Sequence, residues 1–399
     1  GKALGLAGHL HGTVVHGGLQ ELLVVQVGDH FIDHAVAGPA GGVHAHVGDL
    51  AQNRAEAEQC DGLIEVPFER FVGDAAQVGD HLVTGGGVGG AVLGHVGEAA
   101  PLAGYTEDSL EKTRAALTRV LSADAGLIGA SIEQPEDIVG LLTELDLTPA
   151  AAHAIDQALL SLLARRARRS ISSLLAPNPR SAVASHALIH DLDGARRAIG
   201  RGISALKIKL GLNSWDQELL WVETLRDELG PEVAIRVDVN GAWTLEQAIR
   251  AWPELHRLGV DLVEDPVGIE DLDGARALRE LKGPRVALDQ GCTNEEQLQR
   301  RIAAQSADVI VLKPMVIGGL QRARDLALAA AQAGLSVMVT TCLESELGRQ
   351  AALAVARAVP AGALEVCGLD PVASVWPGGE LLRGPLPNPM ASSGIAEPT

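Results

Sequence analysis

The chain has 399 residues, of which 47% are hydrophobic and 21% are charged, and its formal net charge is −19. This composition is typical of a water-soluble globular protein, and the acidic excess argues against nucleic acid as a partner. The sequence has no apolar run near the roughly 18 residues that span a membrane. Its start at Gly1 lacks the layout of a secretory signal, and its four cysteines lack metal-type spacing. We therefore expect a cytoplasmic protein, with homo-oligomer formation left open.

Residues 1–96 differ in composition from the rest of the chain. They hold nine of the thirteen histidines and all three phenylalanines, and glycine and valine dominate them. The histidine spacings match no metal site that we can name, and neither a helical nor a strand period persists. Two hypotheses follow for this range: a disordered or poorly packed segment, and the translation of a misread frame in GC-rich DNA.

Residues 97–180 are predicted to be mostly helical. Gly97–Tyr105 is an expected loop, after which Thr106 is the expected N-cap of a first helix. Two further helices are expected over Pro135–Leu142 and Thr148–Arg165. The first of these two has proline at its entry, where a missing N–H is tolerated.

From residue 181 to residue 370, short apolar strands alternate with amphipathic helices. The expected strands are Ala182–Ile189, Ile203–Lys209, Val233–Val239, Leu262–Asp265, Val286–Asp289, Val309–Lys313, Ser336–Thr341 and Ala363–Val366. The expected helices include Trp215–Glu228, Thr244–Leu258, Asn294–Ala304, Leu320–Ala333 and Leu347–Ala358. Such alternation is typical of parallel βα units, and eight strands favour a closed α/β barrel. A doubly wound open sheet fits the same spacing.

Polar residues stand at the C-terminal ends of five successive predicted strands. They are Lys209, Asp238 with Asn240, Glu264 with Asp265, Asp289, and Lys313. The steps from Lys209 to Asp238, Glu264, Asp289 and Lys313 are 29, 26, 25 and 24 residues, about one βα unit each. In a barrel these strand ends meet at one mouth, where active sites of this architecture lie. Each residue alone has a structural interpretation, such as a turn at Asp238–Gly241, but the set in register favours a site.

The residue types at this mouth indicate metal-assisted proton transfer. Three convergent carboxylates, Asp238, Glu264 and Asp289, form a hard oxygen site that suits Mg²⁺. Lys209 and Lys313 flank them, and an amine near a divalent cation and another ammonium is favoured in its neutral form. Such a lysine can remove a proton next to a carboxylate while the metal stabilises the resulting enediolate.

At these motifs the sequence resembles the enolase superfamily, in its muconate-lactonizing subgroup. The motifs are Lys-Ile-Lys209, Val-Asp238-Val-Asn-Gly, Val-Glu264-Asp-Pro, Leu-Asp289 and Leu-Lys313-Pro. Within the subgroup the resemblance is strongest to the o-succinylbenzoate synthases of menaquinone biosynthesis. The segments that support it are Gly97–Tyr105, Thr340–Gly348 and Cys367–Asp370, and the resemblance covers residues 97 to about 385.

The resemblance implies an α/β fold, a modified TIM barrel of (β/α)7β type with an α+β capping domain. The barrel would take residues 181–370, and residues 97–180 would form the remainder of the cap. The N-terminal part of the cap, residues 1–96, is atypical, and the tail from residue 371 to residue 399 would return to the cap.

The resemblance also implies roles for individual residues. Lys209 would remove the α-proton of 2-succinyl-6-hydroxy-2,4-cyclohexadiene-1-carboxylate and then protonate the departing hydroxyl on the same face. Lys313 would stabilise the intermediate from the opposite face, and Lys207 would lower the pKa of Lys209. The Mg²⁺ ligands would be Asp238, Glu264 and Asp289. The residues lining the pocket for this small carboxylate substrate would be Asn240, Thr341, Cys342, Leu343, Glu344, Ser345, Gly368 and Leu369.

Two departures from the family pattern leave alternatives open. The family usually has Asp-Glu where this chain has Asp289-Gln290, and residues 1–96 do not match the capping strands and mobile loop that the family places there. The alternatives to the synthase are an N-acylamino acid racemase or dipeptide epimerase on the same scaffold, and a non-catalytic product with a defective cap. Dipeptide epimerases carry an Asp-x-Asp near the eighth strand, which Gly368-Leu369-Asp370 lacks.

Overall fold

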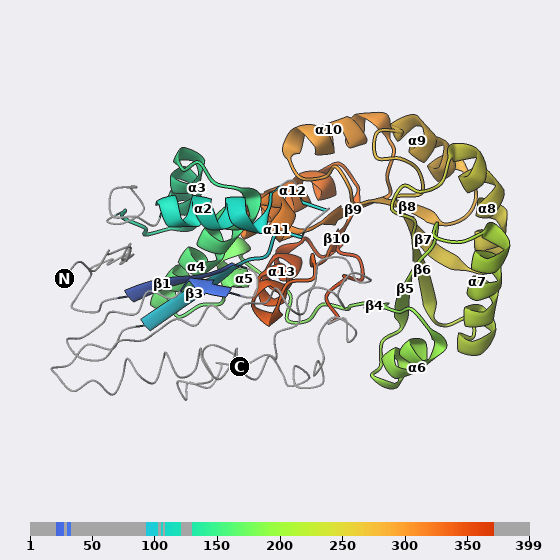
Figure 1. Cartoon of the computed structure of the whole chain (residues 1–399), viewed down its shortest axis with the longest axis horizontal. Coiled ribbons are helices and arrows are strands. Elements are labelled where there is room, and N and C mark those ends of the chain that lie inside the picture. The colour runs from blue at the N-terminus through green and yellow to red at the C-terminus, as the bar shows by residue number, and fades with distance from the viewer. Residues whose placement is uncertain are drawn as a thin grey trace, which may run out of the picture.

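The computed structural model describes residues 21–27, 30–32, 93–102, 105–106, 108–120 and 130–370, the first two ranges by their backbone alone. A barrel lies on one side of the molecule and a smaller cap on the other (Figure 1). Within the described ranges, no helix combines the length and the apolar character needed to cross a membrane. The predicted C-terminal tail lies outside the described residues.

The barrel is built on a sheet of seven parallel strands in the order β10-β9-β8-β7-β6-β5-β4. Their bounds are β4 (Ala187–Leu188), β5 (Ala205–Lys209), β6 (Ala234–Asp238), β7 (Val260–Glu264), β8 (Arg285–Leu288), β9 (Val309–Leu312) and β10 (Ser336–Val339). The sheet curls, so that its two edges approach each other. This α/β architecture confirms the predicted fold class.

The segment that follows the last barrel helix closes the gap between the two edges of the sheet. Parallel bridges join Leu364 to Val337 and Gly368 to Thr340 on one side, and Cys367 to Ser185 on the other. The segment therefore takes the place predicted for an eighth strand. Closure leaves no long unpaired edge at this point of the barrel.

The barrel helices lie outside the curled sheet, as Figure 1 shows for α7 to α10. Their bounds are α6 (Leu192–Gly200), α7 (Trp215–Leu229), α8 (Leu245–Arg257), α9 (Leu272–Glu280), α10 (Glu295–Ala304), α11 (Pro314–Ile317), α12 (Leu320–Gln332) and α13 (Glu346–Ala358). Polar caps mark several of their starts, for example at α8, where Thr244 accepts a hydrogen bond from the Gln247 amide.

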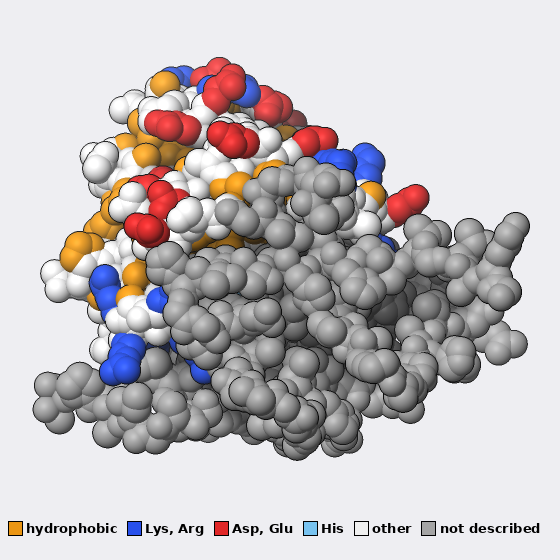
Figure 2. Space-filling view, turned by 90° about the vertical axis from the view of Figure 1, so that its left-hand side faces the viewer, with side chains coloured by type: hydrophobic (Ala, Val, Ile, Leu, Met, Phe, Trp, Pro, Cys, Tyr) orange, Lys and Arg blue, Asp and Glu red, His pale blue; other side chains and the backbone are white. Residues whose placement is uncertain are grey.

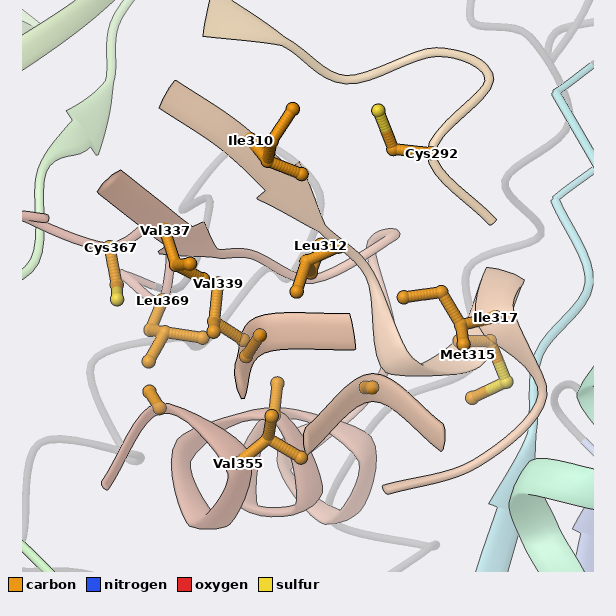
Figure 3. Close-up of a cluster of buried hydrophobic side chains, with 14 of the residues drawn as sticks. Cys292, Ile310, Leu312, Met315, Ile317, Val337, Val339, Val355, Cys367 and Leu369 are labelled. Atoms are coloured by element: carbon orange, nitrogen blue, oxygen red, sulfur yellow. The ribbon is translucent and has the colours of Figure 1, made fainter. Parts of the chain in front are cut away.

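Strand alternation divides the apolar side chains into an interior and an outer set. Val309 and Val311 of β9 and Met338 of β10 belong to a small buried cluster inside the barrel. The intervening Ile310 and Leu312 belong to the larger core between the sheet and the helices. Figure 3 shows part of this outer core, in which Leu312 of β9 and Val339 of β10 lie on the side of α13, which carries Val355. The interior face is the one that matters for the site.

In the described residues, the cap combines a three-stranded sheet with four helices. The sheet has the order β2-β1-β3, with β1 (Glu21–Val27), β2 (His30–Ile32) and β3 (Leu93–Ala99). The helices are α2 (Leu110–Val120), α3 (Pro135–Glu144), α4 (Pro149–Ala167) and α5 (Ile171–Leu175). Figure 2 looks onto the cap side, where acidic side chains gather at the top of the face, over α2 and α3.

The cap differs from the sequence expectation at three points. In residues 1–96, expected to be disordered or poorly packed, the described residues form β1, β2 and the first part of β3, and the rest of this range lies outside the described residues. The expected loop at Gly97–Tyr105 begins inside β3, because Gly97 allows the strand to approach the backbone of Ala154 on α4. The first helix starts at Leu110, after Thr106, whose hydroxyl instead donates to backbone carbonyls of nearby residues.

Candidate active site at the barrel mouth

The alternation of the strands directs the predicted charged side chains into the barrel mouth. Val311 faces the interior, and Lys313 is the next residue on that face of the chain. In the neighbouring strands, Lys209 of β5 pairs in register with Asp238 of β6, and Asp238 pairs with Glu264 of β7. Local strand geometry therefore brings residues from separate βα units side by side.

Lys207 and Lys209 hold two of the three predicted metal ligands. Lys207 Nζ lies 2.8 Å from Asp238 Oδ2 and 2.8 Å from both carboxylate oxygens of Glu264. Lys209 Nζ donates to the same Asp238 oxygen at 2.7 Å and to Asn240 Oδ1 at 2.5 Å. The five side chains form one continuous network, which is the first half of the site.

Asp289 and Lys313 form the second half together with a residue from the cap. Lys313 Nζ donates hydrogen bonds to Asp289 Oδ2 and to Tyr105 Oη. Tyr105 Oη donates in turn to Asp289 Oδ2 at 2.7 Å. Lys313 Nζ also lies 4.1 Å from the centre of the Tyr105 ring, in a cation–π contact. The cap thus contributes a side chain to the barrel mouth.

Lys209 and Lys313 stand on opposite sides of the mouth. Lys209 ends β5 and Lys313 follows β9, which lies four steps away in the sheet order. Since seven strands and one closing segment complete the circuit, four steps is half of it. A small molecule held between them would meet an amine on either face.

Burial and mutual proximity set the pKa values of the carboxyl groups. Glu264 is 1% exposed, and burial raises its pKa to about 7, with Asp238 and Asp289 adding to the rise and Lys207 opposing it. Burial also disfavours the Asp238 carboxylate, but the ammonium groups of Lys207 and Lys209 outweigh burial and hold its pKa well below the usual range. Asp238 and Asp289 thus both lie within electrostatic reach of Glu264.

The protein's own charges favour the ammonium forms of Lys207 and Lys313. Burial alone would lower the pKa of each amine, but Glu264 and Asp238 raise the pKa of Lys207. Asp289 likewise raises the pKa of Lys313. The neutral amine expected of the base rests instead on the field of a nearby divalent cation and on neighbouring ammonium groups, and it stays a prediction.

The donor chemistry of the site fits a hard divalent cation. Asp238, Glu264 and Asp289 supply only carboxylate oxygens, the ligands that Mg²⁺ prefers. Their side chains are turned toward lysines, and among the described residues no group of three or more histidine, cysteine, aspartate or glutamate side chains is arranged to hold a metal ion. Binding of Mg²⁺ therefore requires these carboxylates to exchange ammonium partners for the ion.

Backbone conformation at the strand ends also shapes the mouth. Asn240, Asp265 and Leu343 have φ angles of 51°, 43° and 64°, which side-chain-bearing residues seldom adopt. The buried Asp265 carboxylate accepts hydrogen bonds from the backbone N–H groups of Asp289 and Gln290, at 3.0 and 3.2 Å. Asp265 therefore fixes the backbone that carries Asp289.

The predicted pocket residues from 341 to 345 occupy the loop between β10 and α13. Cys342 and Glu344 are buried and interact electrostatically with Lys313. Burial raises the pKa of Glu344 to about 8, and its carboxylate accepts a hydrogen bond from the Cys342 amide. Ser345 points toward the cap, where its hydroxyl donates to Glu98 at 2.6 Å.

The predicted residues 368 and 369 lie on the closing segment. A Cβ at Gly368 would meet Thr340 and, at 3.1 Å, Nε2 of His186. The backbone N–H of Leu369 donates to Ser185 Oγ at 2.9 Å, and its side chain is buried. Both residues therefore bind the closing segment to its neighbours at the level of the mouth.

Sequence reasoning missed the roles of Tyr105 and Glu98. Both come from the segment Gly97–Tyr105, and both reach barrel residues more than 180 positions away in the chain. The available signal was a carboxylate within an apolar stretch, together with the chain's single tyrosine. Nothing local in the sequence says that they face the barrel.

Comparison with known proteins shows which proteins this barrel is similar to. The family described as enolase C-terminal domain-like matches residues 191–376. A chloromuconate cycloisomerase of Cupriavidus pinatubonensis is 34% identical over 217 residues, which are 53% of this chain and 59% of that protein. An o-succinylbenzoate synthase of Thermobifida fusca is 34% identical over 170 residues, 42% of this chain and 52% of that protein. The matches thus span little more than half of these relatives.

A solved structure agrees with this assignment. The dipeptide epimerase of Enterococcus faecalis, complexed with Mg and the dipeptide L-Leu-L-Tyr, is 25% identical and has a TM-score of 0.62. The similarity covers 69% of this chain and 78% of that one. The barrel of this chain is an α/β barrel with a lysine and carboxylate mouth. This barrel is similar to the enolase C-terminal domain-like family over residues 191–376, and the proteins that it resembles include a cycloisomerase, a synthase and an epimerase.

Proposed function

We propose that the protein is a Mg²⁺-dependent lyase of the o-succinylbenzoate synthase type. It would dehydrate 2-succinyl-6-hydroxy-2,4-cyclohexadiene-1-carboxylate to 2-succinylbenzoate, a step of menaquinone biosynthesis in the cytoplasm. The observation that carries the proposal is the placement of Lys209 and Lys313 half a barrel apart, with three carboxylates on the strands between them. The similarity to a synthase over 42% of the chain supports it.

The chain's own residues account for the proton movements of this reaction. Lys209, as the free amine, takes the proton from the carbon next to the substrate carboxylate. The electron pair of that C–H bond forms the new ring double bond, and the C–O bond to the hydroxyl breaks. The ammonium of Lys209 returns the proton to the departing hydroxyl on the same face, so that one water leaves and the ring becomes aromatic.

Other residues of the mouth stabilise the charge that develops on the substrate carboxylate. Lys313 remains an ammonium on the opposite face, which its contacts with Asp289 and Tyr105 favour. Asp238, Glu264 and Asp289 would hold Mg²⁺, which acts as a Lewis acid on that carboxylate when it is bound. Asn240 accepts a hydrogen bond from Lys209 and so orients the amine.

A 1,1-proton transfer is the second candidate, because the same two lysines favour it. An amine on each face would let one lysine remove an α-proton and the other return it, as in an N-acylamino acid racemase or dipeptide epimerase. The similarity to the dipeptide epimerase structure supports this reading. The sequence Gly368-Leu369-Asp370, without an Asp-x-Asp, argues against the dipeptide as its substrate.

The two candidates separate in one assay series with the full chain. The protein is incubated with Mg²⁺ and either the cyclohexadiene substrate, an N-succinylamino acid in D₂O, L-Leu-L-Tyr in D₂O, or a chloromuconate. Formation of the aromatic product, lost on addition of EDTA, supports the synthase. Deuterium exchange with racemisation and no dehydration supports the second candidate instead. Absence of turnover with all four substrates would refute both and support the non-catalytic alternative.

A further inference from the structure

The junction between cap and barrel contains a buried carboxylate that the reaction does not use. Glu98 of β3 is 2% exposed, and its two oxygens accept three hydrogen bonds from the start of α13. Oε1 accepts from the Ser345 amide at 2.9 Å, and Oε2 accepts from the Ser345 hydroxyl at 2.6 Å and from the Gly348 amide at 2.7 Å. These donors are the unpaired groups that begin a helix.

The other end of Glu98 is fixed by helix α4 of the cap. The Glu98 amide donates to Gln157 Oε1 at 2.9 Å, and the Glu98 carbonyl lies 2.9 Å from His153 Nδ1. Gln157 Nε2 donates to the carbonyl of Leu347, also at the start of α13. The backbone of Glu98 is therefore fixed by the cap helix α4, while its carboxylate binds the start of the barrel helix α13. Glu98 thus links the cap to the barrel.

The approach of Glu98 to α13 depends on a glycine. A Cβ on Gly348 would lie 2.9 Å from Glu98 Oε2 and 2.5 Å from the Glu344 side chain. Only a residue without a side chain fits between the Glu98 carboxylate and the side-chain carbons of Glu344. The close contact between β3 and α13 therefore depends on Gly348 as well as on Glu98. It lies next to Glu344, a predicted pocket residue.

The loop of residues 341–345, which Glu98 contacts, has a backbone conformation that its own side chains disfavour. Leu343 has φ of 64°, a conformation that is sterically unfavourable for a branched side chain. Such a backbone persists only where surrounding contacts determine it. The same loop carries Cys342 and Glu344, both within electrostatic reach of Lys313.

We propose that Glu98 is a positioning residue: from the cap, it fixes the loop of residues 341–345 against Lys313 and so sets the shape of the substrate pocket. The consequence for catalysis rests on the proposed function. The cap then has a specific role at the pocket, because the conformation of the loop depends on a cap side chain that takes no part in the proposed proton transfer.

The variant Glu98→Gln tests this role with a nearly unchanged volume. The three groups of α13 that contact the Glu98 carboxylate are all donors, so the NH₂ of glutamine must face at least one of them without an acceptor. The matched control is Asp271→Asn, which removes a carboxylate charge at the start of α9, where Asp271 accepts from the Gly274 amide at 2.9 Å. A second variant, Ser345→Ala, deletes the hydroxyl contact with Glu98 and the hydrogen bond that the same hydroxyl accepts from the Leu347 amide at 3.2 Å. It leaves both backbone contacts of the Glu98 carboxylate intact and provides the second test if Glu98→Gln does not fold.

Hydrogen–deuterium exchange of the full chain is the first readout. We expect amides 341–350 to exchange at least about tenfold faster in Glu98→Gln, with a smaller rise in Ser345→Ala. In both test variants, the amides of β5 and β6 should exchange at the wild-type rate. In Asp271→Asn, amides 341–350 should also exchange at the wild-type rate. Unchanged exchange at 341–350 in both variants, or an equal rise throughout the barrel, would overturn the role of Glu98.

Steady-state kinetics with the cyclohexadiene substrate is the second readout. We expect KM to rise about tenfold in Glu98→Gln while kcat stays within about threefold, because the pocket changes shape and the lysines remain. An unchanged KM with altered exchange overturns the catalytic consequence. If the wild type turns over no substrate, the proposed function fails by itself, and the exchange experiment still decides whether Glu98 holds the loop.

Discussion

Tyr105 and Asp289 are joined by a 2.7 Å hydrogen bond across 184 positions of sequence, and both contact the ammonium of Lys313. The tyrosine belongs to the cap and the other two residues to the barrel. The mouth is therefore completed by a residue from outside the barrel. Because the hydroxyl donates to a carboxylate, this hydrogen bond is of the stronger, charge-assisted kind.

The variant Tyr105→Phe is expected to lower kcat/KM about tenfold, since hydrogen bonds to charged groups contribute roughly 1.5–3 kcal/mol. The ring face under Lys313 remains, so the change isolates the hydroxyl. Steady-state kinetics at saturating Mg²⁺ measures the effect, with the melting temperature as a check on folding. Wild-type kcat/KM in a folded variant would show that the Tyr105 hydroxyl does not organise Asp289 and Lys313.

The variant Glu264→Gln is expected to weaken Mg²⁺ binding at least about tenfold, because it removes one of three carboxylates from the proposed metal site. Lys207 keeps a carboxylate partner in Asp238, so the fold should survive. Titration calorimetry with Mg²⁺ measures the affinity, and Glu296→Gln on the exposed face of α10 is the matched control. Equal affinities in the two variants would contradict the assignment of Glu264 as a ligand.

The buried His153 is expected to make the protein less stable in acid. Burial lowers its pKa from 6.5 to about 4, although its contact with the Glu98 carbonyl opposes the shift. The unfolded chain therefore binds the proton more tightly, and the stability present above pH 6.5 is lost as the pH falls toward 4. Between pH 7 and pH 5 this amounts to about 2 kcal/mol.

Urea unfolding of wild type and His153→Gln at these two pH values measures that contribution. The free energy of unfolding should fall by about 2 kcal/mol more in the wild type than in the variant. Other buried groups, such as His186 with its lowered pKa and Glu344 with its raised pKa, contribute equally to both proteins and cancel in the comparison. The same fall in both proteins would mean that His153 is not the titrating group.

The parts of the fold and site that sequence predicted well are those governed by local periodicity. Short apolar strands with side chains alternating between two faces place Lys209, Asp238 and Glu264 on one face at strand ends, and parallel register then brings them together. The predicted strand Ala182–Ile189 is shorter in the structure, where β4 spans only Ala187–Leu188, because Ser185 pairs with the closing segment by a single bridge.

What the sequence could not provide were contacts between the cap and the barrel. Glu98 sat in an expected loop, and its partner Ser345 was expected to line the substrate pocket, whereas the structure joins the two. No periodicity links positions so far apart in the chain, and the close approach depends on Gly97 and Gly348, which carry no side-chain signal. The carboxylates that pair with Lys207 and Lys313 likewise become visible only in three dimensions.

The initial rate of dehydration of the cyclohexadiene substrate at saturating Mg²⁺, compared between wild type, Lys209→Ala and Lys282→Ala, tests the central assignment most directly. Lys282 is exposed, away from the mouth, and serves as the matched lysine control. We predict turnover by wild type and Lys282→Ala, and a loss of about 10³-fold or more in Lys209→Ala with its fold and Mg²⁺ binding intact. A Lys209→Ala protein that retains the wild-type rate would contradict the assignment of Lys209 as the base.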